Sequence, residues 1–264
     1  MIKEIKKAIL VISSGTTNEK ARKENIEAVE RKIAAEFSHY EVRRAFTSHK
    51  ILNRLKDAGI HIDTPREALE KLICEGFTDV LIQPLHIIAG SEYKRIIDES
   101  EEFKWKFQSL TVSTPLLYSE KNYESIIEIF KQECSVLEEL EAIVYMGHGG
   151  RGTGNESYAV LQDYIDKNKL NIFIGTINSE PSIHSIIEKL REKNIKKLIL
   201  MPFMLVAGNH ALIDMASPNE DSWKSIFEKE GFEVNIHLHG LGEKEKYQNL
   251  YIQRLKEIII KDMR

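Results

Sequence analysis

The sequence is poor in cysteine, in long apolar runs and in any excess of one charge. Only Cys74 and Cys134 occur among 264 residues, and they have neither C-x-x-C spacing nor a second pair beside them. A disulfide framework or a thiolate zinc site is therefore not expected, and a reducing compartment fits best. The apolar run AILVI (8–12) is too short for a signal peptide or a membrane span and is typical of a buried strand. We expect a cytoplasmic protein that does not associate with membranes.

The charges exclude further classes of partner. The 37 basic and 41 acidic residues are interspersed and leave a net charge of -4, with no basic stripe and no acidic tail. This distribution argues against a nucleic-acid partner and indicates only solubility. The hydrophobic content of 42% is enough for one large core or two smaller ones. A homo-oligomer is left open, because exposed apolar patches cannot be identified from sequence.

Strand-like apolar runs alternate with segments of helical period. In the first half the strand-like runs are AILVI (8–12), YEVRRAF (40–46) and DVLIQPLHII (79–88), and in the second half EAIVYM (141–146), NIFIGTI (171–177) and KKLILMPFMLVAG (196–208). Helical segments lie between them, including 66–75, where Thr64-Pro65 provides a start signal and Gly76 a stop signal. The pattern predicts an α/β protein with parallel sheets covered on both faces.

The second half repeats the first. Aligning DVLIQPLHIIAGSEY with KLILMPFMLVAGNHA, and AILVISSG with AIVYMGHG, pairs these residues: Pro84 with Pro202, Ala89 with Ala207, Gly90 with Gly208, Glu92 with His210, Ser14 with His148, and Gly15 with Gly149. Two matched junctions in the same order predict a duplicated unit. We expect domains at 1–128 and 129–264, joined by the helical NYESIIEIFKQEC (122–134), with the metal-site histidines in the second. A final helix, EKYQNLYIQRLKEIII, closes the chain.

The loop VYMGHGGRGTGN (144–155) has several interpretations. Gly147, Gly149 and Gly152 match the dinucleotide pattern G-x-G-x-x-G, but the matched loop SSGTTN does not, so nicotinamide binding is the weakest interpretation. A glycine-rich connection in which His148 only fills a gap stays open. Ligands of open parallel sheets bind beyond the carboxyl ends of the strands, so facing halves would bring Ser14, Glu92, His148 and His210 to one cleft. Two histidines there are a plausible metal pair.

The remaining histidines point to structural roles. His86 lies inside an apolar run, and we expect it to be buried with its hydrogen bonds satisfied. His237 and His239 alternate along a late strand and share one face. An H-x-H pair can chelate a metal, but a structural role or a place in a cleft wall is favoured.

Several longer segments together resemble the anaerobic sirohydrochlorin cobaltochelatases, which are class II, ferrochelatase-like chelatases. The segments are RAFTSHKILNRL (44–55), IDTPREALEKL (62–72), QPLHIIAGSEY (83–93), GHG (147–149), PFMLVAGNHALIDMA (202–216) and HLHGLGE (237–243). The resemblance covers nearly the whole chain and implies two similar Rossmann-like or flavodoxin-like domains with a tetrapyrrole cleft between them. It also implies insertion of Co2+, the substrate metal, into sirohydrochlorin or its precorrin form, with release of two protons, in anaerobic cobalamin biosynthesis. Neither ATP nor an organic cofactor is expected.

The resemblance also implies site residues. His148 and His210 match two metal ligands of the family, and His148 is the expected proton acceptor. Glu92 is a further catalytic candidate, because it is the counterpart of His210 in the first half, either as a proton acceptor or as a transient metal ligand. The family's third ligand is a glutamate, but Asn178 stands at its position in G-T-I-N. Glu180 could replace that glutamate or could only cap the following helix. The expected substrate-binding residues flank the two matched loops and are Ser14, Gly15, Thr16, Gly149, Gly150 and Arg151. Arg44 and Arg151 could attract substrate carboxylates.

Other functions stay open beside cobalt insertion. The neutral Asn178 would suit a non-catalytic chelatase homologue that binds a tetrapyrrole or a metal. A chelatase for Fe2+ or Ni2+ is also compatible, because ligand types alone do not select among these ions. A dinucleotide-dependent oxidoreductase is a distant third.

Overall fold

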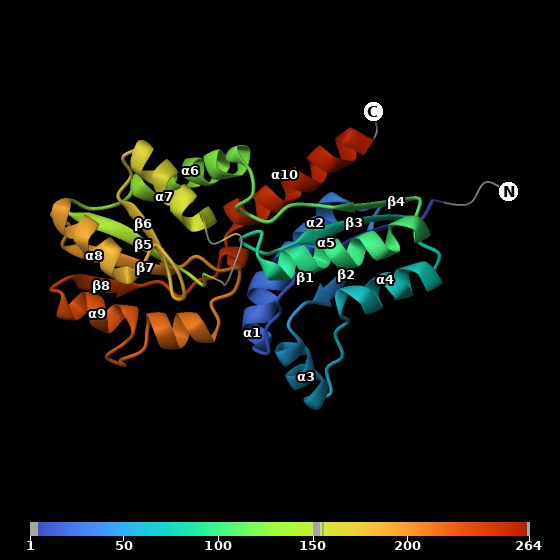
Figure 1. Cartoon of the computed structure of the whole chain (residues 1–264), viewed down its shortest axis with the longest axis horizontal. Coiled ribbons are helices and arrows are strands. Elements are labelled where there is room, and N and C mark those ends of the chain that lie inside the picture. Colours follow the sequence, from blue (N-terminus) through green and yellow to red (C-terminus); the bar gives the residue numbers. More distant parts are fainter. Residues whose placement is uncertain (1–4, 150–153, 155, 263–264) are drawn as a thin grey trace. The chain divides into compact units, whose positions relative to one another are not determined.

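The computed structural model describes residues 5–149, 154 and 156–262, and it divides into two compact units. Unit 1 consists of Met1–Leu116 together with Glu245–Arg264, and unit 2 consists of Leu117–Lys244. Figure 1 shows a strand-and-helix architecture in each unit.

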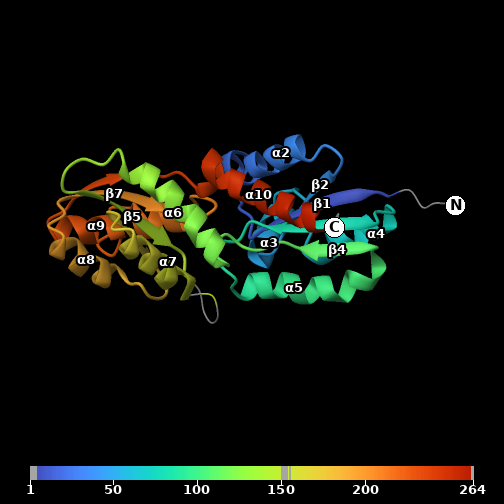
Figure 2. The same ribbon diagram turned by 90° about the horizontal axis from the view of Figure 1, so that it is seen from above.

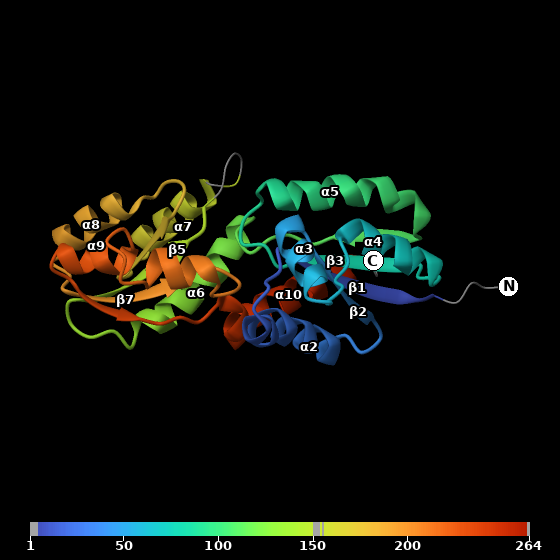
Figure 3. The ribbon, with the colours of Figure 1, turned by 90° about the horizontal axis from the view of Figure 1, so that it is seen from below.

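The sheet of unit 1 has four parallel strands in the order β2-β1-β3-β4. The strands are β1 (Lys7–Ser13), β2 (Glu41–Phe46), β3 (Asp79–Pro84) and β4 (Ser109–Val112). The helical segments are α1 (Glu19–Ala21), η1 (Arg22–Ile26), α2 (Glu27–Glu36), α3 (His49–Asp57), α4 (Pro65–Cys74), α5 (Ser91–Phe103), η2 (Lys104–Lys106) and α10 (Glu245–Asp262). Figures 2 and 3 show α2 and α10 on one face of this sheet and α4 and α5 on the other.

Both faces of this sheet are buried, as continuous apolar strands require. Ala8, Leu10 and Ile12 of β1 pack with residues of α4 and α5, and Ile9 and Val11, which alternate with them, are equally inaccessible to solvent. Helix α4 begins with a capping box between Thr64 and Glu67 and has Pro65 in its first turn. The start signal predicted from the sequence is confirmed.

Unit 2 has the same topology, with parallel strands in the order β6-β5-β7-β8. The strands are β5 (Glu141–Gly147), β6 (Ile172–Thr176), β7 (Lys197–Pro202) and β8 (Glu233–Ile236). The helical segments are α6 (Glu120–Cys134), α7 (Glu156–Lys167), α8 (Ile183–Glu192), η3 (Ala211–Met215), α9 (Trp223–Lys229) and η4 (Leu241–Glu243). Alternate residues of β5, Ala142, Val144 and Met146, pack with α8, α9 and η3, while Tyr145 stacks on Phe130 of α6.

The register confirms the duplication. Ile12 pairs with Pro84 in the sheet of unit 1, and Met146 pairs with Pro202 in that of unit 2, as the alignment predicts. Gly15 and Gly149, the matched glycines after β1 and β5, both have a positive φ, of +86° and +69°. Each unit therefore has a positive-φ glycine at the same position after its first strand.

The division into units differs from the sequence-predicted boundary at 128/129. Helix α6 belongs to unit 2, because Phe130 stacks on Tyr145 with ring centroids 5.2 Å apart. Helix α10 belongs to unit 1, because Tyr251 donates a hydrogen bond to the Leu85 carbonyl and Arg254 bonds to the carbonyls of Thr114, Pro115 and Leu116. Helical periodicity predicts that a helix has a buried face, but it does not identify the sheet that the face covers.

The described part of the chain also has no helix that is long and apolar enough to cross a membrane.

Candidate metal centre

Two histidines meet where β5 and β7 of unit 2 end. His148 directly follows β5, and His210 directly precedes η3, in the segment that follows β7. Their Nε2 atoms lie 3.2 Å apart, and the rings are nearly perpendicular, with an interplanar angle of 76°. Both residues are exposed. The pairing predicted from the aligned junctions is therefore present within one unit.

The hydrogen bond at Nδ1 determines which nitrogen of each neutral ring carries the proton. The Nδ1 atom of His148 lies 2.8 Å from the Gly149 carbonyl oxygen, and that of His210 lies 2.5 Å from Asp214 Oδ2. A carbonyl and a carboxylate only accept hydrogen bonds, so each Nδ1 must donate. In the neutral rings, each Nε2 then carries a lone pair, and the two Nε2 atoms lie 3.2 Å apart. A bound cation could accept both lone pairs.

The separation suits one bound metal ion. Imidazole nitrogens bind zinc at about 2.0–2.1 Å, so two nitrogens on one such ion lie roughly 2.9–3.4 Å apart for bond angles between about 90° and 109°. The 3.2 Å between the two Nε2 atoms falls within this range. Imidazole is a good ligand for divalent cobalt, iron, nickel and zinc.

Close packing holds the residues on either side of His148 in place. A Cβ on Gly147 would lie 2.6 Å from the buried Tyr158 ring, and one on Gly149 would lie 2.7 Å from Ser179 Oγ. Burial raises the pKa of the Tyr158 phenol, which therefore stays protonated at neutral pH. The two glycines let the backbone on either side of His148 lie directly against Tyr158 and Ser179.

The sequence leaves the third ligand open, and the structure places both of its candidates in the loop after β6. Asn178 is exposed and donates its amide N–H to the His148 carbonyl at 3.3 Å. Glu180 is exposed and accepts the Ser182 backbone N–H at 2.7 Å, directly before α8. Among the described residues, no group of three or more His, Cys, Asp or Glu side chains is arranged to hold a metal. The observed centre is a histidine pair with a carboxylate behind one ring.

The matched junction of unit 1 forms a hydrogen-bonded carboxylate cluster. Ser14 Oγ donates to Glu92 Oε2 at 2.5 Å, and His86 Nε2 lies 3.1 Å from the same oxygen. Ser14 and Glu92 are the counterparts of His148 and His210, so the same two positions meet in both units. Burial raises the pKa of Glu92, but the hydrogen bond and charge of His86, with bonds from Ser14 and Thr47, outweigh it and lower the pKa to about 2. Glu92 is thus a carboxylate at neutral pH and a weak base.

His86 only partly matches its sequence-based interpretation. Its side chain is nearly inaccessible to solvent, as expected for a residue inside an apolar run. Its Nε2 is bonded to Glu92, but its Nδ1 is buried with no hydrogen-bond partner in the described part of the chain. The His86 ring therefore holds Glu92 in place, although one of the two ring nitrogens has no hydrogen bond among the described residues.

The other expected substrate-binding residues vary in their surroundings. Gly15 packs against Phe46, where a Cβ would lie within 2.9 Å of three ring atoms. Thr16 Oγ1 accepts the Asn18 backbone N–H at 3.2 Å and so supports the turn before α1. Gly150 and Arg151 lie outside the described residues. The sequence pattern predicts that His237 and His239 alternate along a strand, but β8 ends at Ile236, so both follow the strand, and His239 Nδ1 lies 2.8 Å from Glu243 Oε2.

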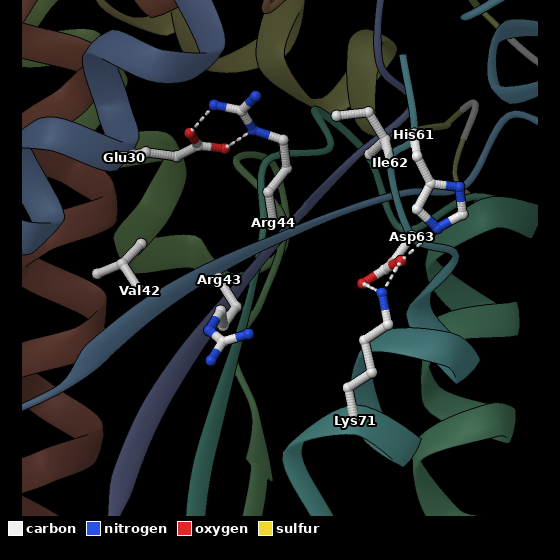
Figure 4. Close-up of a pocket in the computed structure, with 8 residues that line it drawn as sticks. All are labelled: Glu30, Val42, Arg43, Arg44, His61, Ile62, Asp63 and Lys71. Carbon is white, nitrogen blue, oxygen red and sulfur yellow. Dashed lines mark hydrogen bonds and ion pairs between the residues drawn. The ribbon is translucent and has the colours of Figure 1, made fainter. Parts of the chain in front are cut away.

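A pocket of about 300 Å³ lies beside β2 of unit 1 (Figure 4). Its lining consists of Glu30, Val42, Arg43, Arg44, His61, Ile62, Asp63 and Lys71. The basic groups are already paired with carboxylates: Arg44 Nε donates to Glu30 at 2.8 Å, and Lys71 donates to Asp63 at 2.7 Å. Arg44 therefore does not present a free guanidinium to substrate carboxylates, contrary to its sequence-based interpretation.

Sequence reasoning missed one residue of the centre, Asp214. The signal was present, since Asp214 lies four residues after His210 in a segment of helical character, where such residues are neighbours. The same spacing relates His239 to Glu243.

The fold places this chain in a known structural class. Its structure is similar to SirB from Bacillus subtilis with Fe3+ at a TM-score of 0.62 and 14% identity, covering 96% of this chain and 95% of that one. It is also similar to CbiX, described as the terminal enzyme for biosynthesis of siroheme in denitrifying bacteria, at a TM-score of 0.57 and 16% identity, covering 95% and 99%. At these identities the likeness concerns the fold alone, which is that of the chelatases.

The sequence comparisons narrow the class to a family. Residues 7–260 match the family described as Cobalt chelatase (CbiK). The chain is 38% identical to a sirohydrochlorin cobaltochelatase of Salmonella typhimurium, covering 97% of both chains. It is 31% identical to the sirohydrochlorin cobaltochelatase CbiKC of Nitratidesulfovibrio vulgaris, covering 95% of this chain and 89% of that one. The chain belongs to the cobalt chelatase (CbiK) family.

Proposed function

We propose that this protein inserts Co2+ into sirohydrochlorin, or its precorrin form, without ATP, in the oxygen-independent route to cobalamin. The names of the two curated relatives support the reaction. The observation that carries it is the pair of Nε2 atoms of His148 and His210, 3.2 Å apart, with both Nδ1 atoms engaged elsewhere.

In the reaction one divalent cation replaces two pyrrole protons of the tetrapyrrole. The histidine pair can both bind the cation and accept the protons. Each Nε2 lone pair can bind the incoming ion or accept a proton, but not both at once. As a pyrrole nitrogen replaces an imidazole on the ion, the released Nε2 becomes free to accept a proton. His148 and His210 thus act first as ligands and then as acceptors of one proton each.

Glu92 suits a different task from the proton acceptance expected of it. With a pKa of about 2 it stays ionised at neutral pH and accepts protons poorly. We propose that it acts as a fixed negative charge that attracts divalent cations to the carboxyl end of the unit 1 sheet, and that Ser14 and His86 hold it in place.

An anaerobic insertion assay tests this function. Purified protein is mixed with sirohydrochlorin and Co2+, Fe2+ or Ni2+, and the tetrapyrrole absorbance is followed against the uncatalysed reaction. We expect acceleration with Co2+ and loss of most of it in both His148→Ala and His210→Ala. Tetrapyrrole binding without acceleration by any of the three metals would refute an enzyme, and acceleration only with Fe2+ or Ni2+ would refute the choice of cobalt.

The alternative is a chelatase homologue that binds a tetrapyrrole or a metal without catalysis, and Asn178 favours it. Its neutral amide stands at the position of the family's glutamate ligand and donates to the His148 carbonyl. Asn178→Glu tests its importance: a rise in the insertion rate would indicate that a carboxylate ligand is lacking here. Glu180→Ala is the companion variant. An unchanged insertion rate in that variant would indicate that Glu180 only accepts the hydrogen bond of the Ser182 backbone N–H and is not a metal ligand.

A further inference from the structure

We infer that Asp214 is a positioning residue for the metal centre, which orients His210 and fixes the tautomer that binds the ion; the inference rests on the proposed function. Asp214 lies on η3, one helical turn after His210. Its Oδ2 is 2.5 Å from His210 Nδ1, and the opposite ring nitrogen is the one that faces His148. The aspartate therefore acts on the ion only through the imidazole.

The two rings of the pair are held by unlike groups. His148 donates to a backbone carbonyl, that of Gly149, which no side-chain substitution removes. His210 depends on a side chain, and its ring is half exposed, with 49% of the side chain accessible. Without Asp214 the His210 ring could rotate or carry its proton on Nε2, and in either case His210 would no longer present an Nε2 lone pair next to Nε2 of His148.

A simple surface ion pair is the competing explanation. The chain has other exposed histidine–carboxylate contacts, between His61 and Asp63 and between His239 and Glu243. In neither case does the remaining ring nitrogen contact a second imidazole among the described residues, whereas Nε2 of His210 lies 3.2 Å from Nε2 of His148. A carboxylate that holds the far nitrogen of a ligating histidine is the usual support in protein metal sites.

The fold of unit 1 shows that this α/β fold does not require an acidic residue at the position of Asp214. By the alignment that pairs Glu92 with His210, the counterpart of Asp214 is Ile96, which is buried with 1% of its surface exposed. The carboxylate occurs in the unit that has a histidine at the aligned position, and an apolar residue occurs in the unit that has a glutamate there. This correlation is expected if Asp214 supports His210 and not the fold.

Three substitutions separate these explanations. Asp214→Ala removes the acceptor, Asp214→Asn keeps the shape but removes the charge, and Asp214→Glu retains a carboxylate. The Glu243 contact with His239 shows that a glutamate four residues after a histidine can reach Nδ1 in this chain. Glu243→Gln is the matched control, because it neutralises the other histidine–carboxylate pair with this spacing.

The first measurement is Co2+ binding to the protein alone, followed by the ligand-field absorption of the bound ion. We expect the Kd of Asp214→Ala to rise about 10- to 100-fold, as for other residues that support metal-bound histidines. Asp214→Asn should lie between that variant and the parent, Asp214→Glu should restore most of the affinity, and Glu243→Gln should match the parent. The inference would be overturned if both Asp214→Ala and Asp214→Asn had the same Kd and absorption spectrum as the parent protein. It would also be overturned if His210→Ala still bound Co2+ as the parent does.

The second measurement is the insertion rate, which separates this inference from the proposed function. We expect Asp214→Ala to raise the KM for Co2+ and to leave the KM for sirohydrochlorin unchanged. If the parent binds Co2+ through the histidines but inserts no metal, the proposed function fails, and a weaker Kd in Asp214→Ala still supports the positioning role. Circular dichroism at matched temperatures verifies that each variant is folded.

Discussion

Replacing Gly149 by alanine should destabilise unit 2 and weaken metal binding together. The residue has a φ of +69°, and a left-handed backbone costs an L-residue about 1–2 kcal/mol. The new Cβ would also lie 2.7 Å from Ser179 Oγ and 3.0 Å from Thr176 Cβ, and overpacking of this kind costs roughly 1–3 kcal/mol. We therefore expect the free energy of unfolding to fall by about 2–5 kcal/mol.

A second glycine of the same unit isolates the packing contribution. Gly231 has a φ of +88°, but a Cβ there would have no atom of the described chain within 4 Å. Gly231→Ala should cost only the backbone contribution of about 1–2 kcal/mol and should leave Co2+ binding unchanged. Urea unfolding monitored by circular dichroism measures both variants. Equal losses would refute the tight packing of Gly149 against Ser179 and Thr176.

Two further predictions concern unit 1. Arg254→Ala removes the guanidinium donors to the Pro115 and Leu116 carbonyls, at 2.6 and 2.7 Å, and should lower the free energy of unfolding by about 3–5 kcal/mol. Gln253→Ala, at an exposed position, should change that free energy by less than about 0.5 kcal/mol. Equal urea midpoints for the two variants would contradict this prediction. The lowered pKa of Glu92 means that its contacts stabilise the fold above its ordinary pKa of 4.5 and are lost as the pH falls from 4.5 to about 2. Glu92→Gln should therefore lose stability less steeply over that interval, and identical slopes for parent and variant in urea unfolding would contradict the contacts.

The duplication and the histidine pair could be predicted because they depend on periodicity and alignment. Continuous apolar runs identify buried parallel strands, and matched junctions identify which residues follow equivalent strands. The alignment of Ser14 with His148 and of Glu92 with His210 therefore identified equivalent positions, and the structure brings each pair together within its own unit.

The remaining features depend on interactions that no local pattern records. The sequence predicts helices at 122–134 and 245–260, but only packing assigns α6 to unit 2 and α10 to unit 1. The directions of the Asn178 and Glu180 side chains depend on the loop after β6, where Thr176 Oγ1 and Ser179 are hydrogen bonded to one another. The low pKa of Glu92 depends on His86, six residues away in an apolar run that gave no sign of the contact.

The most direct test of this account is the initial rate of Co2+ insertion into sirohydrochlorin under anaerobic conditions, compared between the parent and His148→Ala. We expect the parent to exceed the uncatalysed rate and the variant to lose at least about 100-fold of the parent's rate, because it lacks both a ligand and a proton acceptor. Full activity in His148→Ala would contradict the central claim that the facing Nε2 atoms of His148 and His210 carry the reaction.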